Sequence, residues 1–117
     1  MDRPWKWGEA DCCMSADDVF CRLTGIAPSA PLRGTYSSRR EAATIINNYG
    51  GFIPMCDTLA ARAGLRSDEH GQPGDLAVCL TGLGVPSLAI CVVPGMYIGK
   101  TLTGLTSVYE AVRHYRA

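Results

Sequence analysis

Apolar residues follow helical spacing through the first half of the chain. The first run starts after Asp11 and stops at Gly25, which stands where a left-handed C-terminal cap is expected. Its apolar positions, which share one helix face, are Cys12, Ala16, Val19, Phe20 and Leu23. Ile26–Tyr36 holds two prolines, one glycine and no period, so we expect a connecting loop there.

Two further helices are predicted before residue 65. Ser38 and Glu41 have capping-box spacing, and the apolar positions that follow them stop at Gly50-Gly51. Those positions are Ala42, Ile45, Ile46 and Tyr49. Pro54 suits the first turn of a third helix, which ends at Gly64. The apolar positions of this third helix are Met55, Leu59, Ala60 and Ala63.

After Gly64, short apolar runs separated by glycine and proline replace the helical period. Leu76–Leu80, Leu88–Val93 and Met96–Leu102 have this character and are predicted to be strands. Val108–Tyr115 fits a helix slightly better than a strand, and a terminal strand packed on the sheet stays open as the alternative.

Helices followed by strands indicate an α+β fold in which N-terminal helices pack on a C-terminal antiparallel sheet. The chain of 117 residues suits a single domain, with a helical part over 1–64 and a strand-rich part over 74–117. A chain of this length buries about 65% of its unfolded surface, which is enough for one core.

The charge balance argues against a nucleic-acid partner. Lys and Arg total 11, Asp and Glu total 11, and no basic stripe is interleaved with aromatics. The longest apolar run, about Leu88 to Val93, is far shorter than the ~20 residues of a membrane span. Met1-Asp2-Arg3-Pro4 does not open a signal peptide, so we expect a soluble protein made in the cytosol.

The six cysteines form no C-x-x-C pair, and neither a metal nor a cofactor is expected. Cys79 and Cys91 lie in apolar runs and are interpreted as core residues, as are Cys21 and Cys56. A metal-binding module is a minor alternative hypothesis. It requires four thiols to converge on one ion, namely those of Cys12, Cys13, Cys21 and Cys56.

Cys12 is the candidate nucleophile, because it directly follows the expected cap residue Asp11. The free N–H groups and positive dipole end of a helix favour thiolate over thiol, and a backbone N–H there can bind an oxyanion. The simpler interpretation is that one thiol of the Cys12-Cys13 pair faces the core and the other is an incidental surface group. Trp5 and Trp7 are expected to cover the core, with their indole N–H groups on polar partners.

The tract Trp5-x-Trp7-Gly8-x-x-Asp11-Cys12 resembles the entry of NlpC-type cell-wall cysteine peptidases, which are papain-like enzymes. Gly74-Asp75-Leu76 is similar to the step that begins the first strand of their sheet. The resemblance implies an NlpC/papain-like fold with the nucleophile at the start of the first core helix. It also implies a histidine base at the start of the next strand.

A narrower likeness is to small phage and prophage proteins of unassigned function that carry Trp-Gly-x-x-Asp-Cys-Cys near the start. Three more of their motifs occur here, namely Leu23-Thr24-Gly25, Arg33-Gly34-Thr35-Tyr36 and Gly74-Asp75-Leu76. This resemblance implies a virion component of the tail tip or baseplate, made in the bacterial host cytoplasm. Its partners would be other tail proteins.

The chain departs from the peptidases at the base. Pro86-Ser87-Leu88 stands where the resemblance places the histidine, and only His70 and His114 exist elsewhere. Either histidine is a candidate base for Cys12, because catalytic partners are spatial neighbours, although a solvated surface role is favoured for both. Arg33, Tyr36, Arg39 and Arg40 form either a polar face for a partner or a solubilising surface.

Two functions follow. The favoured one is a structural or assembly protein of a phage tail tip or baseplate with a degenerate cysteine-peptidase-like fold. The alternative is an active cysteine hydrolase that cleaves peptidoglycan peptide crosslinks, with Cys12 as nucleophile and His70 or His114 as base.

Overall fold

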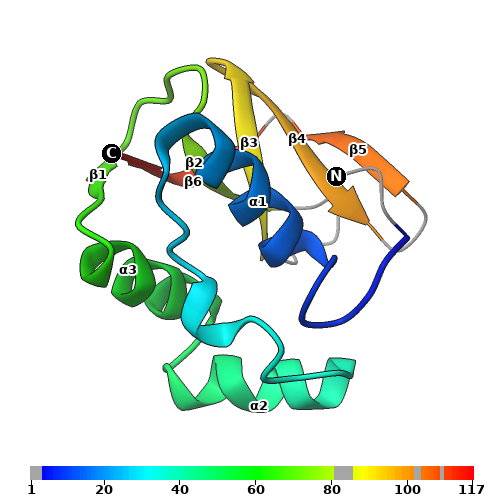
Figure 1. Cartoon of the computed structure of the whole chain (residues 1–117). Helices are drawn as coiled ribbons and strands as arrows, with labels where there is room; N and C mark the ends of the chain where they lie inside the picture. The colour runs from blue at the N-terminus through cyan, green and yellow to red at the C-terminus, as the bar shows by residue number, and fades with distance from the viewer. Residues whose placement is uncertain (1–3, 81–85, 102–103, 109) are drawn as a thin grey trace.

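The chain forms three α-helices, a short 3₁₀ helix and one antiparallel sheet in the part that the computed structural model describes, which is residues 4–80, 86–101, 104–108 and 110–117. The helices are α1 (Cys12–Thr24), η1 (Ala30–Leu32), α2 (Arg39–Asn48) and α3 (Phe52–Arg62). The strands are β1 (Arg66–Asp68), β2 (Leu76–Leu80), β3 (Pro86–Val93), β4 (Met96–Thr101), β5 (Gly104–Val108) and β6 (Ala111–Arg116). The predicted α+β class is confirmed (Figure 1).

The sheet has the order β1-β6-β2-β3-β4-β5, and neighbouring strands are antiparallel. Because β6 inserts between β1 and β2, the end of the chain lies inside the sheet (Figure 1). Leu76, Val78, Leu88 and Tyr115 point to the face that packs on the helices. Residues on the alternate positions, such as Ala77, make a second cluster on the other face.

The first helix matches its prediction at both ends. Asp11 is the N-cap, and its side chain accepts a hydrogen bond from the backbone N–H of Met14 at 2.9 Å. Gly25 is the C-cap with φ of 80°, a left-handed conformation that glycine adopts without steric cost. The buried side chains of Met14 and Phe20 hold α1 against the sheet, where it packs on β2, β3 and β4.

The second and third helices also form as predicted. The Ser38 hydroxyl accepts a hydrogen bond from the N–H of Glu41, and the Glu41 carboxylate in turn binds the N–H and hydroxyl of Ser37. Pro54 lies in the first turn of α3. No residue of α2 is fully buried, and Figure 1 shows α2 at the bottom of the view, away from the sheet. Of the three α-helices, α2 therefore contributes the least buried side-chain surface to the core.

The segment Ile26–Tyr36 is more ordered than a plain connection. The N–H of Ser29 donates to the buried carboxylate of Asp17 at 2.9 Å, and Arg33 pairs with Asp18. Burial raises the pKa of the Asp17 carboxyl. These two contacts fasten the loop to α1, and η1 forms between them.

The segment Val108–Tyr115 holds the end of β5 and most of β6, so the favoured helix interpretation is wrong and the alternative of a terminal strand packed on the sheet is confirmed. The register of β6 explains the difference: Tyr115 pairs with Leu76 and His114 with Ala77, so backbone pairing on both sides decides the conformation. Sequence patterns also missed β5 and β1, the second of which is exposed and three residues long. Leu102, predicted to end a strand, lies outside the described residues.

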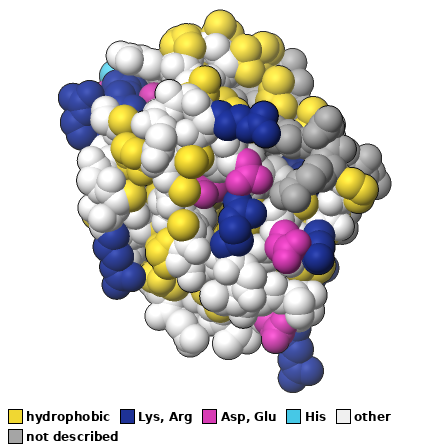
Figure 2. Space-filling model, in the orientation of Figure 1, with side chains coloured by type: hydrophobic (Ala, Val, Ile, Leu, Met, Phe, Trp, Pro, Cys, Tyr) yellow, Lys and Arg dark blue, Asp and Glu magenta, His cyan; other side chains and the backbone are white. Residues whose placement is uncertain are grey.

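Figure 2 shows acidic and basic side chains interspersed on one face of the molecule. Hydrophobic side chains gather at the top of this view, over the turn between β3 and β4, where Val92 and Val93 are exposed. None of the described helices is long and apolar enough to cross a bilayer.

Candidate functional site

Cys12 is the first residue of α1, and its thiol is partly buried at the start of the helix. Its Sγ lies 3.9 Å from Sγ of Cys13, whose side chain is buried. The interpretation that one thiol of the pair faces the core is confirmed for Cys13.

The surroundings of Cys12 favour its thiolate. The adjacent Cys13 thiol lowers the pKa of Cys12 by hydrogen bonding to it, and the backbone N–H of Leu88 on β3 acts in the same direction. Burial and the charge of Asp11 oppose this effect but do not cancel it. The pKa of Cys13 is raised, first by its hydrogen bond to Cys12 and then by burial. Cys12 is therefore the ionisable member of the pair.

The Asp11 carboxylate is enclosed by three donors. It accepts hydrogen bonds from the N–H groups of Gly8 and Met14, both at 2.9 Å, and from the Tyr36 hydroxyl. Only 2% of Asp11 is exposed. With its lone pairs engaged in this way, Asp11 holds the start of α1 and is not free to move a proton at Cys12.

Gly8 and Tyr36 bring two distant motifs together. The N–H of Gly34 donates to the Gly8 carbonyl at 3.0 Å, and a Cβ at Gly8 would lie 2.2 Å from the Tyr36 carbonyl oxygen. Gly8 also has φ of 79°, which disfavours any other residue. The Trp-Gly-x-x-Asp and Arg-Gly-x-Tyr motifs thus pack against each other beside Cys12.

A cavity of about 420 Å³ opens beside Cys12. Part of the cavity wall consists of Asp11, Cys12, Cys13 and the aromatic rings of Trp7 and Tyr36. Most of the remaining wall comes from α2 and α3. The helical contribution consists of Arg39, Ala42, Ala43, Ile45, Ile46, Phe52 and Met55, and Leu32 and Pro86 complete the wall. This size falls within the about 300–1,000 Å³ of small-molecule sites. Sequence reasoning missed this cavity, although the apolar stripe of α2 was visible.

The two tryptophans pack edge to face with ring centroids 5.1 Å apart and an interplanar angle of 82°. Trp7 packs against the core and lines the cavity, as the expected covering role requires. The expectation of polar partners for both indoles is wrong for Trp5, because its buried Nε1 has no hydrogen-bond partner among the described residues.

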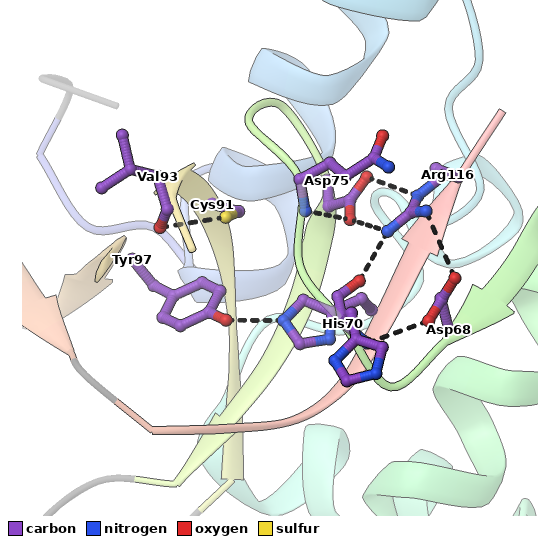
Figure 3. Close-up of polar contacts among 9 residues, drawn as sticks. Asp68, His70, Asp75, Cys91, Val93, Tyr97 and Arg116 are labelled. Atoms are coloured by element: carbon purple, nitrogen blue, oxygen red, sulfur yellow. Dashed lines mark hydrogen bonds and ion pairs between the residues drawn. The ribbon is translucent and has the colours of Figure 1, made fainter. Parts of the chain in front are cut away.

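His114 lies on the face of the sheet opposite to α1. It pairs in register with Ala77, which belongs to the second cluster, and its Nε2 is 2.6 Å from the Tyr97 hydroxyl (Figure 3). The expected surface role is wrong for His114, because the side chain is only 3% exposed; its Nδ1 has no partner among the described residues. A Cβ at Gly71 would lie 2.8 Å from Nε2, so a loop covers the ring. The structure does not bring His114 to Cys12.

His70 lies in the exposed loop after β1. Its N–H donates to the Asp68 carboxylate at 2.9 Å, and its carbonyl accepts from Arg116 at 2.6 Å (Figure 3). Both contacts belong to the β1–β6 edge of the sheet, whereas Cys12 neighbours Leu88 on β3. The chain has two histidines, and neither is hydrogen-bonded to Cys12.

Gly74-Asp75-Leu76 has a structural role in this fold. The buried Asp75 carboxylate accepts from Arg116 at 2.7 and 3.1 Å and from the N–H of Gln72 at 2.9 Å (Figure 3). The N–H of Gly74 donates to the carbonyl of Cys91 at 2.8 Å. This motif therefore joins the start of β2 to β3 and β6.

The thiols do not assemble as a metal-binding module requires. Cys12, Cys13 and Cys56 are close enough for their charges to interact, but Cys21 is outside this group. Among the described residues, no cluster of three or more His, Cys, Asp or Glu side chains is arranged to hold an ion. Cys79 and Cys91 are buried in the second cluster, as predicted.

Comparison with known families shows which family the chain belongs to. The profile of a domain of unknown function, DUF6950, covers residues 1–117. The chain belongs to this family. No match was found among curated proteins, and none was found among solved structures. The family description assigns no activity. The function of this DUF6950 chain is therefore inferred from the geometry around Cys12.

Proposed function

We propose that this chain is a structural or assembly protein of a phage tail tip or baseplate, built on a degenerate cysteine-peptidase-like domain. The observation that carries the proposal is the environment of Cys12. The β3 group that interacts with its thiol is the backbone N–H of Leu88, and both histidines of the chain have other neighbours. A nucleophile without an adjacent imidazole lacks the general base that supplies ~10²–10⁴ in rate.

The arrangement around α1 supports an NlpC/papain-like origin for the domain. A cysteine opens the first helix, this helix packs across β2, β3 and β4, and β2 follows Gly74-Asp75. The strand after β2 reaches the thiol at Leu88, two residues beyond its start at Pro86. In the family that the sequence resembles, the start of this strand carries the histidine. Pro86-Ser87-Leu88 in its place removes the general base but keeps the arrangement of the helix and the strands.

The cavity walls also disfavour a cell-wall substrate. A peptide crosslink carries amides and charged groups, and each amide buried without a hydrogen bond costs about 1–3 kcal/mol. The wall of this cavity offers mostly hydrocarbon, and its one carboxylate, Asp11, is already engaged. Tail partners and a virion location rest on the likeness to small phage proteins.

The test uses a phage that carries this gene. We expect Cys12→Ala and Cys12→Ser phages to form plaques at wild-type efficiency, and deletion of the gene to stop tail assembly. Mass spectrometry of purified virions should detect the chain in the tail. Normal tails in the deletion phage, or virions without the chain, would contradict a structural role.

An active cysteine hydrolase is the second candidate, because Cys12 has a lowered pKa and borders an open cavity. Purified peptidoglycan incubated with the chain distinguishes the two functions. Release of soluble peptides by the wild type, lost in Cys12→Ala, would establish the hydrolase and overturn the proposal. We expect no release from either protein.

A further inference from the structure

The cavity beside Cys12 is unusually poor in groups that bind polar ligands. Ile45 and Ile46 of α2 and Phe52 and Met55 of α3 give it a hydrocarbon wall, and Pro86 contributes a residue without an N–H. A ligand that carries internal amides or hydroxyls would lose hydrogen bonds to water there and find few replacements. The walls therefore select an alkyl chain over a peptide, sugar or nucleotide.

Most of the polar groups that line the cavity are already hydrogen-bonded to other groups of the protein. The Tyr36 hydroxyl donates to Asp11, whose carboxylate also accepts from the N–H groups of Gly8 and Met14. These groups form a closed network and add no free charge for a ligand. The charged side chain that lines the cavity without such a network is Arg39.

Arg39 is the first residue of α2, and its side chain is exposed at the rim of the cavity. Among the residues that the structure describes, the Arg39 guanidinium has no ion-pair or hydrogen-bond partner. The neighbouring Glu41 carboxylate is bound to Ser37 instead. A guanidinium beside an apolar cavity is complementary to a carboxylate that carries an alkyl chain.

We infer that this cavity is a binding site for a fatty acid, with the alkyl chain against α2 and α3 and the carboxylate on Arg39. The volume of about 420 Å³ suits a ligand of this class. The peripheral place of α2, which has no fully buried residue, lets the wall adjust to the chain. Binding requires no reaction at Cys12 and does not depend on the tail assignment.

The test titrates the full chain with dodecanoate, dodecanol and dodecyltrimethylammonium below their micelle-forming concentrations. Trp7 lines the cavity, so its fluorescence reports occupancy, and calorimetry gives the affinity. We expect dodecanoate to bind about tenfold more tightly than dodecanol, because a charge-assisted hydrogen bond is added. The trimethylammonium compound should bind more weakly than both.

Matched variants on α2 locate the two parts of the ligand. Arg39→Gln should remove the preference for dodecanoate over dodecanol, whereas Arg40→Gln, next to it but outside the lining, should keep it. Ala42→Phe should fill the cavity and weaken both ligands at least about tenfold. Thr44→Phe, an exposed position of the same helix outside the lining, is its control, and circular dichroism checks folding.

The inference fails if folded wild-type protein does not bind dodecanoate. It also fails if dodecanol or the trimethylammonium compound binds as tightly, or if Arg39→Gln and Arg40→Gln act alike. Equal affinities of the Ala42→Phe and Thr44→Phe variants would place the ligand elsewhere and overturn it too. None of these results bears on tail assembly, which the gene deletion tests separately.

Discussion

At the scale of single residues, Asp11 is the side chain on which the geometry of the site depends. It caps α1, which places Cys12 at the first helical position, and it binds the Tyr36 hydroxyl from the loop after α1. A buried carboxylate is tolerated here because three donors surround it. Asp11 therefore has the structural role of the cap residue that the sequence predicts.

Asp11→Ala should lower the free energy of unfolding by about 3 kcal/mol, because it removes a helix cap and leaves buried donors without partners. Tyr36→Phe removes one of the three hydrogen bonds and should cost about 1 kcal/mol. Urea denaturation measures both values. A loss in Asp11→Ala no larger than that in Tyr36→Phe would show that the carboxylate is not the central partner.

Cys12 should be alkylated faster than the buried thiols of Cys13, Cys56, Cys79 and Cys91. Its folded-state pKa is lowered, first by the hydrogen bond with Cys13, so its thiolate forms at lower pH than that of an unperturbed thiol. Burial raises the pKa of Cys79 to about 12, which opposes its reaction. Iodoacetamide labelling across pH, followed by peptide mass spectrometry, measures this order. A Cys12 rate that rises only above pH 9 would contradict the assignment.

At the scale of elements, the segment between α1 and α2 decides how the site is assembled. The sequence predicts an irregular loop, because Ile26–Tyr36 has no period. Its irregular backbone is nonetheless fixed by contacts to α1 and to the residues before it, through Ser29, Arg33 and Gly34. These contacts join residues far apart in sequence, so local patterns do not reveal them.

Gly8→Ala should destabilise the protein by about 3 kcal/mol or more. The new Cβ would meet the Tyr36 carbonyl oxygen at 2.2 Å, in addition to the cost of a positive φ. Gly34→Ala is the matched control, since Gly34 has φ of 75° but no atom within 4 Å of its Cβ position. The control should cost about 1 kcal/mol. Thermal and urea unfolding compare the two, and equal losses would exclude the close contact as the cause.

At the scale of the whole molecule, stability is expected to be uneven. The sheet and α1 share the buried cluster, whereas α2 contributes only partly buried side chains and borders the cavity. A helix with few buried contacts opens locally at a lower free energy than the core around it.

Amide hydrogen exchange should therefore be faster in α2 than in α1, β2 or β3. Exchange in β2 and β3 should require global unfolding, while α2 should exchange by local opening. Mass-spectrometric exchange at several urea concentrations separates the two regimes. Equal protection of α2 and β3 would show that α2 is part of the cooperative core.

Periodicity, capping residues and turn-forming glycines were enough to predict the three helices, both caps of α1, the N-cap of α2 and three of the strands, because these signals act over short distances. Sequence patterns also identified Cys12 as the cysteine at a helix start. That a histidine is expected where Pro86-Ser87-Leu88 stands comes from the resemblance to the peptidases alone. For Val108–Tyr115 the local pattern slightly favours a helix, but the strand alternative is correct, because pairing with β2 on one side and β1 on the other outweighs that pattern.

The surroundings of Cys12 follow from the packing of segments that are far apart in the sequence. The strand register placed His114 on the opposite face of the sheet and Leu88 beside the thiol. The packing of α2 and α3 beside α1 created the apolar cavity with Arg39 at its rim. These arrangements depend on which faces of distant segments meet, and that is fixed by burial of the whole core, not by the pattern along any one segment.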